Sequence, residues 1–208
     1  MKILDKLKEK IRLDKQLFVF YVILLITGII AGSLFVTILK QEDIMLINNH
    51  LNNFLNNIES NKIDYLNAMK SNLIINVSLI LIIWLLGISI IGLPIIIIIY
   101  FSKLFITGFT VSSIIATFKF KGLIFSILYI VPSQIILILI LILLMIFSSS
   151  FSCKLSYSIF KRKTFDFKRI MNKYFKILLI SLITAIITSL YDSYLLPIIL
   201  KSLISFIR

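Results

Sequence analysis

The chain has 208 residues, of which 60% are hydrophobic, and a formal net charge of +13. Soluble domains are only about 45–50% apolar, and the single cysteine excludes an internal disulfide and a cysteine-rich metal site. The basic residues gather in short segments beside apolar ones, which is typical of cytoplasmic membrane loops and argues against a nucleic-acid partner. We therefore predict an all-α, polytopic integral membrane helix bundle, a single domain over 1–208 in contact with membrane lipids.

The N-terminal part of the chain combines a basic segment with a first membrane span. Residues 1–16 predict a short basic amphipathic helix on the cytoplasmic surface, because apolar residues recur at helical spacing. Residues 17–39 predict a retained span, since the apolar stretch is too long for a signal peptide and no cleavage pattern follows it. Gly28 and Gly32 form a GxxxG pattern in this span, which permits close approach of a second helix.

Residues 40–72 form the only sizeable polar loop, which is nearly neutral and is therefore predicted to lie outside the cell. Apolar residues spaced three and four apart line one face of a helix within it, namely Ile44, Ile47, Leu51, Phe54 and Ile58. This helix either lies on the outer membrane surface, packs on the membrane bundle, or docks a partner. The lone histidine, His50, is predicted to be a solvated loop residue.

A second span is predicted over 73–101, a stretch too long for one untilted crossing. Gly92 and Pro94 should break or kink it, because proline cannot donate a backbone hydrogen bond to the preceding turn. Lys103 then stands between this span and the next.

A short segment over 104–118 decides the topology. It contains Gly108 and several hydroxyl residues, which favour burial against other helices over lipid contact. If it crosses, the basic loop over 152–176 shares the cytoplasmic side with the N-terminus, and if it is re-entrant that loop lies outside. The positive-inside rule favours a crossing.

Two further spans are predicted over 122–151 and 177–200. Pro132 lies in the first of them, and Gln134 could hydrogen-bond the carbonyls that the proline frees. Asp192 lies near the outer end of the second, where it either reaches the head-group region or makes a specific contact with the bundle or a partner. The prediction is therefore five transmembrane helices, with the N-terminus cytoplasmic and the C-terminus outside.

The sequence carries no HExxH, Walker loop, GxSxG or ladder of intramembrane carboxylates. We therefore expect no enzyme, no catalytic or metal site and no cofactor, and an interaction or scaffold role is favoured over transport. The alternative is a small permease or lipid-handling protein. Such a protein needs convergent polar groups at mid-depth, for which the candidates are Thr107, Thr110, Ser113 and Gln134.

Several motifs together carry a family resemblance. WLLGISIIGLP begins at Trp84, TGFTV begins at Thr107, a proline followed by a polar pair begins at Pro132, and YDSYLLP begins at Tyr191. With the basic loop and the basic N-terminus, this combination resembles the stage II sporulation protein M family of endospore formers over nearly the whole chain.

The resemblance implies a non-enzymatic membrane component of the engulfment machinery, located in the cell membrane at the sporulation septum on the mother-cell side. Its partners would be two peptidoglycan-degrading proteins, stage II sporulation proteins D and P, held or recruited while septal wall is thinned. The apolar stripe of the outer loop and Asp192 are the first candidate contacts. Gly28 and Gly32, or the polar face of 104–118, could instead meet a partner's membrane anchor, and self-association stays open.

Overall fold

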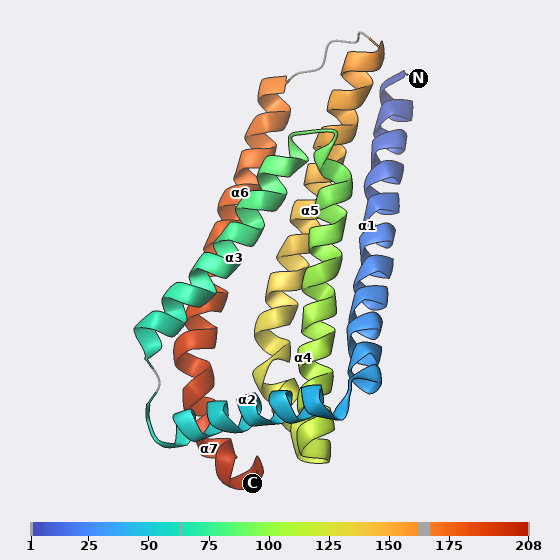
Figure 1. Cartoon of the computed structure of the whole chain (residues 1–208). Coiled ribbons are helices and arrows are strands. Elements are labelled where there is room, and N and C mark those ends of the chain that lie inside the picture. The colour runs from blue at the N-terminus through green and yellow to red at the C-terminus, as the bar shows by residue number, and fades with distance from the viewer. Residues whose placement is uncertain (1, 63, 162–166, 208) are drawn as a thin grey trace.

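The computed structural model describes residues 2–62, 64–161 and 167–207. This described part of the chain is helical apart from short connections, without strands, and five of its helices are long and apolar enough to cross a membrane. The helices form an elongated bundle with the two termini at opposite ends (Figure 1). The predicted fold class and the number of spans are therefore confirmed.

The first helix, α1 (Lys2–Phe35), runs without interruption into a short 3₁₀ turn, η1 (Val36–Ile38). Residues 2–16 are therefore helical as predicted, but they continue directly into the first span and do not form a short helix of their own. Neither glycine nor proline precedes Gly28 in the sequence, so nothing breaks the helix where the basic segment meets the span. At 1.5 Å per residue α1 is about 50 Å long, so it extends beyond a hydrocarbon layer of about 30 Å.

The second helix, α2 (Gln41–Glu59), lies across one end of the bundle (Figure 1). Leu55 and Ile58 on its C-terminal half are buried in a small apolar cluster. The other buried members of that cluster come from α4 and α7 and are Ile114, Phe125 and Leu200. Of the three alternatives for this helix, packing on the bundle is therefore correct for its C-terminal half, whereas Ile44 near its start is exposed.

The next two helices, α3 (Tyr65–Gly87) and α4 (Gly92–Tyr129), are joined by a turn over residues 88–91. The predicted break at Gly92 and Pro94 is therefore confirmed, whereas the single span over 73–101 is wrong, and so is the start of the next span at 104. The chain turns back here because Gly92 packs directly on the carbonyl of Leu86, where any side chain would collide. Lys103, expected between two spans, lies inside α4.

The chain reverses again within α4. Lys119 has φ 53° and ψ −130°, and Gly122 then packs on the backbone of Ile114, so the last part of α4 folds back on the part before it. The predicted end of a span at 118 and start of another at 122 agree with this reversal. The chain continues into α5 (Val131–Lys161), whose second residue is Pro132.

The last part of the chain contains α6 (Phe167–Leu190), a five-residue π-helical segment η2 (Tyr191–Leu195) and α7 (Leu196–Ile207). The predicted span over 177–200 lies within the apolar helical stretch Phe167–Lys201, whose winding changes at Asp192. The basic loop is also shorter than the predicted 152–176, and its residues 162–166 lie outside the described part. Its two flanks lie at the same end of the bundle as the N-terminus (Figure 1).

Helix α5 is the central span, and its apolar window is by far the most buried of the five. At the end of the bundle that holds the N-terminus it contacts an aromatic cluster. Tyr174 stacks between Trp84 and Phe151, with ring centroids 5.5 and 5.1 Å away. Its hydroxyl also hydrogen-bonds Ser148 at 2.7 Å and donates to the Trp84 carbonyl at 2.8 Å. These contacts join α3, α5 and α6, and the Tyr174 hydroxyl finds its hydrogen-bond partners within the protein.

Glycines bring α1 and α4 into backbone contact. A side chain at Gly32 would collide with the Phe105 carbonyl, and one at Gly108 would collide with the Ile29 carbonyl. A Cβ at Gly28 would lie 2.8 Å from the Cβ of Leu104. The GxxxG pattern therefore forms a contact within the chain, so the face offered for a partner's membrane anchor is already covered.

Because Pro94 is the third residue of α4, it does not kink a span. A proline in the first helical turn removes no intrahelical hydrogen bond, since the N–H groups of that turn lack helical acceptors. We expect Pro94→Ala to change the midpoint of thermal unfolding in detergent by less than about 2 °C. A loss of 5 °C or more, measured by tryptophan fluorescence, would show that the rigid start of α4 stabilises the bundle.

Candidate functional site

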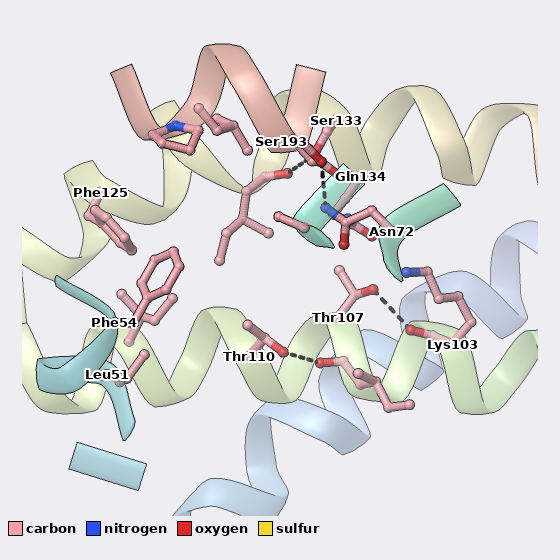
Figure 2. Close-up of a pocket in the computed structure, with 17 residues that line it drawn as sticks. Leu51, Phe54, Asn72, Lys103, Thr107, Thr110, Phe125, Ser133, Gln134 and Ser193 are labelled. Carbon is pink, nitrogen blue, oxygen red and sulfur yellow. Dashed lines mark hydrogen bonds between the residues drawn. The ribbon is translucent and has the colours of Figure 1, made fainter. Parts of the chain in front are cut away.

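A partly open cavity of about 440 Å³ lies in the half of the bundle that is closed by α2. It is enclosed by α2, the start of α3, α4, the start of α5, and the η2–α7 segment (Figure 2). Ile106 and Phe54, which are 57% and 40% exposed, lie at its rim. The volume falls within the range of small-molecule sites, about 300–1,000 Å³.

The cavity has a polar end and an apolar end. Figure 2 shows Leu51, Phe54 and Phe125 at one end, with Asn72, Lys103 and Gln134 at the other. Because α2 lies across one end of the bundle and contributes Leu51 and Phe54, the apolar end of the cavity is the one nearer that end of the bundle. Lys103 is about 16 Å along α4 from its first residue, so the polar end reaches the middle of the span. The remaining lining residues are Ala68, Ile106, Thr107, Thr110, Ile114, Ile130, Ser133, Asp192, Ser193, Leu196 and Pro197.

Helical spacing places Lys103 on the cavity-facing side of α4. Residues 103, 107, 110 and 114 are three or four apart and all line the cavity, so they share one face of the helix. Thr107 donates its hydroxyl to the Lys103 carbonyl at 2.9 Å, and Thr110 donates to the Ile106 carbonyl at 2.8 Å. Each threonine hydroxyl thus already donates its hydrogen to the backbone, and its oxygen can still accept a hydrogen bond from another group.

Asp192 enters the cavity from η2. Single-turn π segments are frequent at functional sites in other proteins. Here a hydrogen bond from Asn72 Nδ2 to Ser193 Oγ holds the segment against α3, and a second one from Asn76 Nδ2 to Ser189 Oγ holds the end of α6 just before it, both 3.1 Å long. Tyr194 also stacks on Tyr65 at 5.9 Å. The Asp192 carboxylate is therefore positioned by contacts with α3, a helix that is distant from it in sequence.

Lys103 and Asp192 face the same cavity and attract each other electrostatically. They form no direct ion pair, although the Ser133 hydroxyl is within reach of the Asp192 carboxylate. The carboxylate Oδ1 and the Gln134 side-chain oxygen are buried and have no hydrogen-bond partner within the described structure. The polar end of the cavity thus carries one positive group and two acceptors without a partner.

The residues singled out from the sequence fall into separate parts of the structure. The cavity joins Leu51, Phe54, Gln134 and Asp192. The others lie elsewhere: Ile58 is buried beneath α2, Ile44 and Ile47 lie nearer its start, Gly28, Gly32 and Gly108 lie between α1 and α4, Gly92 and Pro94 lie at the α3–α4 turn, and Pro132 begins α5.

Lys103 is the cavity residue that sequence reasoning missed as a site residue. The available signal was a lysine inside an apolar run, which in membrane proteins points to a functional or paired group. Of the mid-depth polar candidates, Thr107, Thr110 and Gln134 line the cavity, whereas Ser113 is buried without lining it.

Metal chemistry finds no support in the described residues, which contain no cluster of three or more histidine, cysteine or acidic side chains able to hold an ion. His50 and Cys153 are both exposed and belong to different helices. The described part of the chain therefore offers the cavity as its site.

Comparison with known proteins gives a family assignment. No curated protein and no solved structure matches the chain. The family model described as stage II sporulation protein M matches residues 21–197, which include all five spans in whole or in part and the whole cavity lining. The chain therefore belongs to the stage II sporulation protein M family, as its motifs indicated, and is a sporulation-related membrane protein.

Proposed function

We propose that this protein is a non-enzymatic membrane scaffold of the sporulation engulfment machinery. In this role it holds or recruits peptidoglycan hydrolases, stage II sporulation proteins D and P, at the septal membrane. Family membership supports the setting. The observation that carries the scaffold role is the position of α2, which lies across one end of the bundle and leaves apolar side chains uncovered.

Charge supports an extracytoplasmic position for α2. The N-terminal part of α1 and the flanks of the 162–166 segment are rich in lysine and arginine and lie together at the opposite end of the bundle (Figure 1). Positively charged short segments stay cytoplasmic. The end that carries α2 and the C-terminus then faces the wall, where a hydrolase acts.

Helix α2 has a packed half and an uncovered half. Leu55 and Ile58 fix its C-terminal half to the bundle, whereas Ile44, Met45 and Leu46 are 37%, 61% and 58% exposed. Confining a hydrolase to such a surface raises its effective concentration near the wall without any change in its active site.

The test replaces Ile44, Met45 and Leu46 together with serine, leaving the packed half of α2 intact. Protein purified in mild detergent from sporulating cells should then retain at least fivefold less hydrolase D and P, as measured by mass spectrometry. Ile91→Ser is the matched control, because Ile91 is 81% exposed in the turn at the opposite end. Equal hydrolase recovery from both variants, with equal membrane insertion, would contradict docking on α2.

A second candidate function is a small permease or lipid-handling protein, and the cavity is the observation that favours it. Lys103, Gln134 and Asp192 bring polar groups together within the bundle, the feature that a permease requires and a scaffold does not.

A further inference from the structure

We infer that the cavity binds a small zwitterion with an apolar body, of the kind represented by an apolar amino acid. The ligand's anionic group would meet Lys103, its ammonium group would meet Asp192 and Gln134, and its apolar body would lie toward Phe54 and Phe125. This inference deepens the second candidate function and rests on it. It does not depend on the scaffold role, because the proposed recruitment of hydrolases uses the exposed start of α2 and not the cavity.

The charges at the polar end indicate a ligand that carries both signs. Lys103 and Asp192 line the same cavity without pairing directly. A ligand with only one charge would leave the opposite protein charge facing an apolar membrane interior, which is costly. A zwitterion satisfies both groups and adds no net charge.

The unpartnered acceptors indicate where the ammonium group binds. Asp192 and Gln134 both line the cavity, and each has a buried side-chain oxygen without a donor, which a small turn of the side chain would bring to a bound ammonium group. Buried acceptors without partners are rare in folded proteins, and an ammonium group supplies three donors. Lys103, in contrast, is a donor only, so it is the group that binds a carboxylate.

The direction of the cavity argues against a lipid in its usual orientation. The polar end reaches the middle of α4, and the apolar end lies beneath α2 at the end of the bundle (Figure 2). A phospholipid places its charged group at the membrane surface and its chains inside, which is the reverse. A small molecule fits the cavity if its charged groups lie deep, near Lys103, and its apolar part lies nearer α2.

Calorimetry on the full-length protein in nanodiscs can test each part of the ligand with one probe. Leucine carries all three features, whereas N-acetylleucine lacks the ammonium group, leucinamide lacks the carboxylate, and glycine lacks the apolar body. We expect leucine to bind about tenfold or more tightly than each of the other three, because a lost charge-assisted bond, or the lost burial of the leucine side chain in the case of glycine, costs about that much affinity. No heat with leucine, or equal affinity for N-acetylleucine, would overturn the inference.

Variants identify the site. Lys103→Met with Asp192→Asn removes both charges together, and we expect it to lose leucine binding while keeping its thermal unfolding midpoint within a few degrees. Lys176→Met is the matched control, since Lys176 is exposed near the basic end of α6. Leucine binding that persists in the double variant would overturn the assignment to this cavity.

Two further outcomes separate the alternatives. A phospholipid that stays bound to wild-type protein in native mass spectrometry, and is lost from the double variant, would overturn the amino-acid assignment and identify the occupant as a lipid head group. Wild-type protein that binds leucine while the serine variant of α2 loses the hydrolases would support both functions independently. Failure of leucine binding alone would leave the scaffold role untouched.

Discussion

Gly32→Leu should lower the midpoint of thermal unfolding in detergent by about 10 °C, which corresponds to about 3 kcal/mol for a protein of this size. The physical reason is the contact between α1 and α4. A side chain at Gly32 would collide with the carbonyl of Phe105, a backbone group that cannot turn aside as a flexible side chain can. The two helices must separate for leucine to fit.

Separation of α1 and α4 would also break hydrogen bonds between these two helices. Ser33 donates its hydroxyl to the Gly108 carbonyl, and Ser112 donates to the Ser33 carbonyl, both at 3.3 Å. Thr27→Leu is the matched control, because Thr27 is exposed on α1 and bonds only its own helix. If Gly32→Leu and Thr27→Leu unfold at the same temperature, measured by tryptophan fluorescence, the helices do not depend on close glycine packing.

Composition and charge were sufficient to predict the class, the number of spans and which segments share an end of the bundle. The length of the apolar segments determines how many crossings the chain can make. The lysine-rich segments at the N-terminus and around 162–166 favour the same side of the membrane, which restricts the direction of each crossing. The reversal between 118 and 122 was also predictable, since Lys119 and Lys121 interrupt an apolar stretch there.

A break or kink at Gly92 and Pro94 was predicted, but the boundary between two spans was placed at Lys103, about ten residues too late. Hydropathy treats a charge as a boundary, so Lys103 was taken as the break between spans. The structure instead turns over 88–91, where the residues are mostly apolar and Gly92 packs directly on Leu86. A lysine inside a span is tolerated when it faces a polar cavity, and no local pattern shows that such a cavity exists.

The cavity could be predicted only in part for a similar reason. Gln134 and Asp192 were recognised as unusual polar residues in apolar helices, yet their meeting with Lys103 depends on three helices that are distant in sequence. The π-helical winding that presents Asp192 left no trace in hydrophobic periodicity. Packing, not local propensity, brings these groups together.

The charges of Lys103 and Asp192 should behave as one unit in a double-mutant cycle. Lys103→Met alone leaves the carboxylate without its countercharge, and Asp192→Asn alone leaves the ammonium group, so each should lower the unfolding midpoint by about 5 °C, near 2 kcal/mol. The double variant should recover most of this loss, because a cavity without either charge carries no uncompensated ion. Lys176→Met, which removes an exposed lysine, should change the midpoint by less than about 2 °C. Strictly additive losses in the double variant would show that Lys103 and Asp192 act separately, and each would then need a partner of its own.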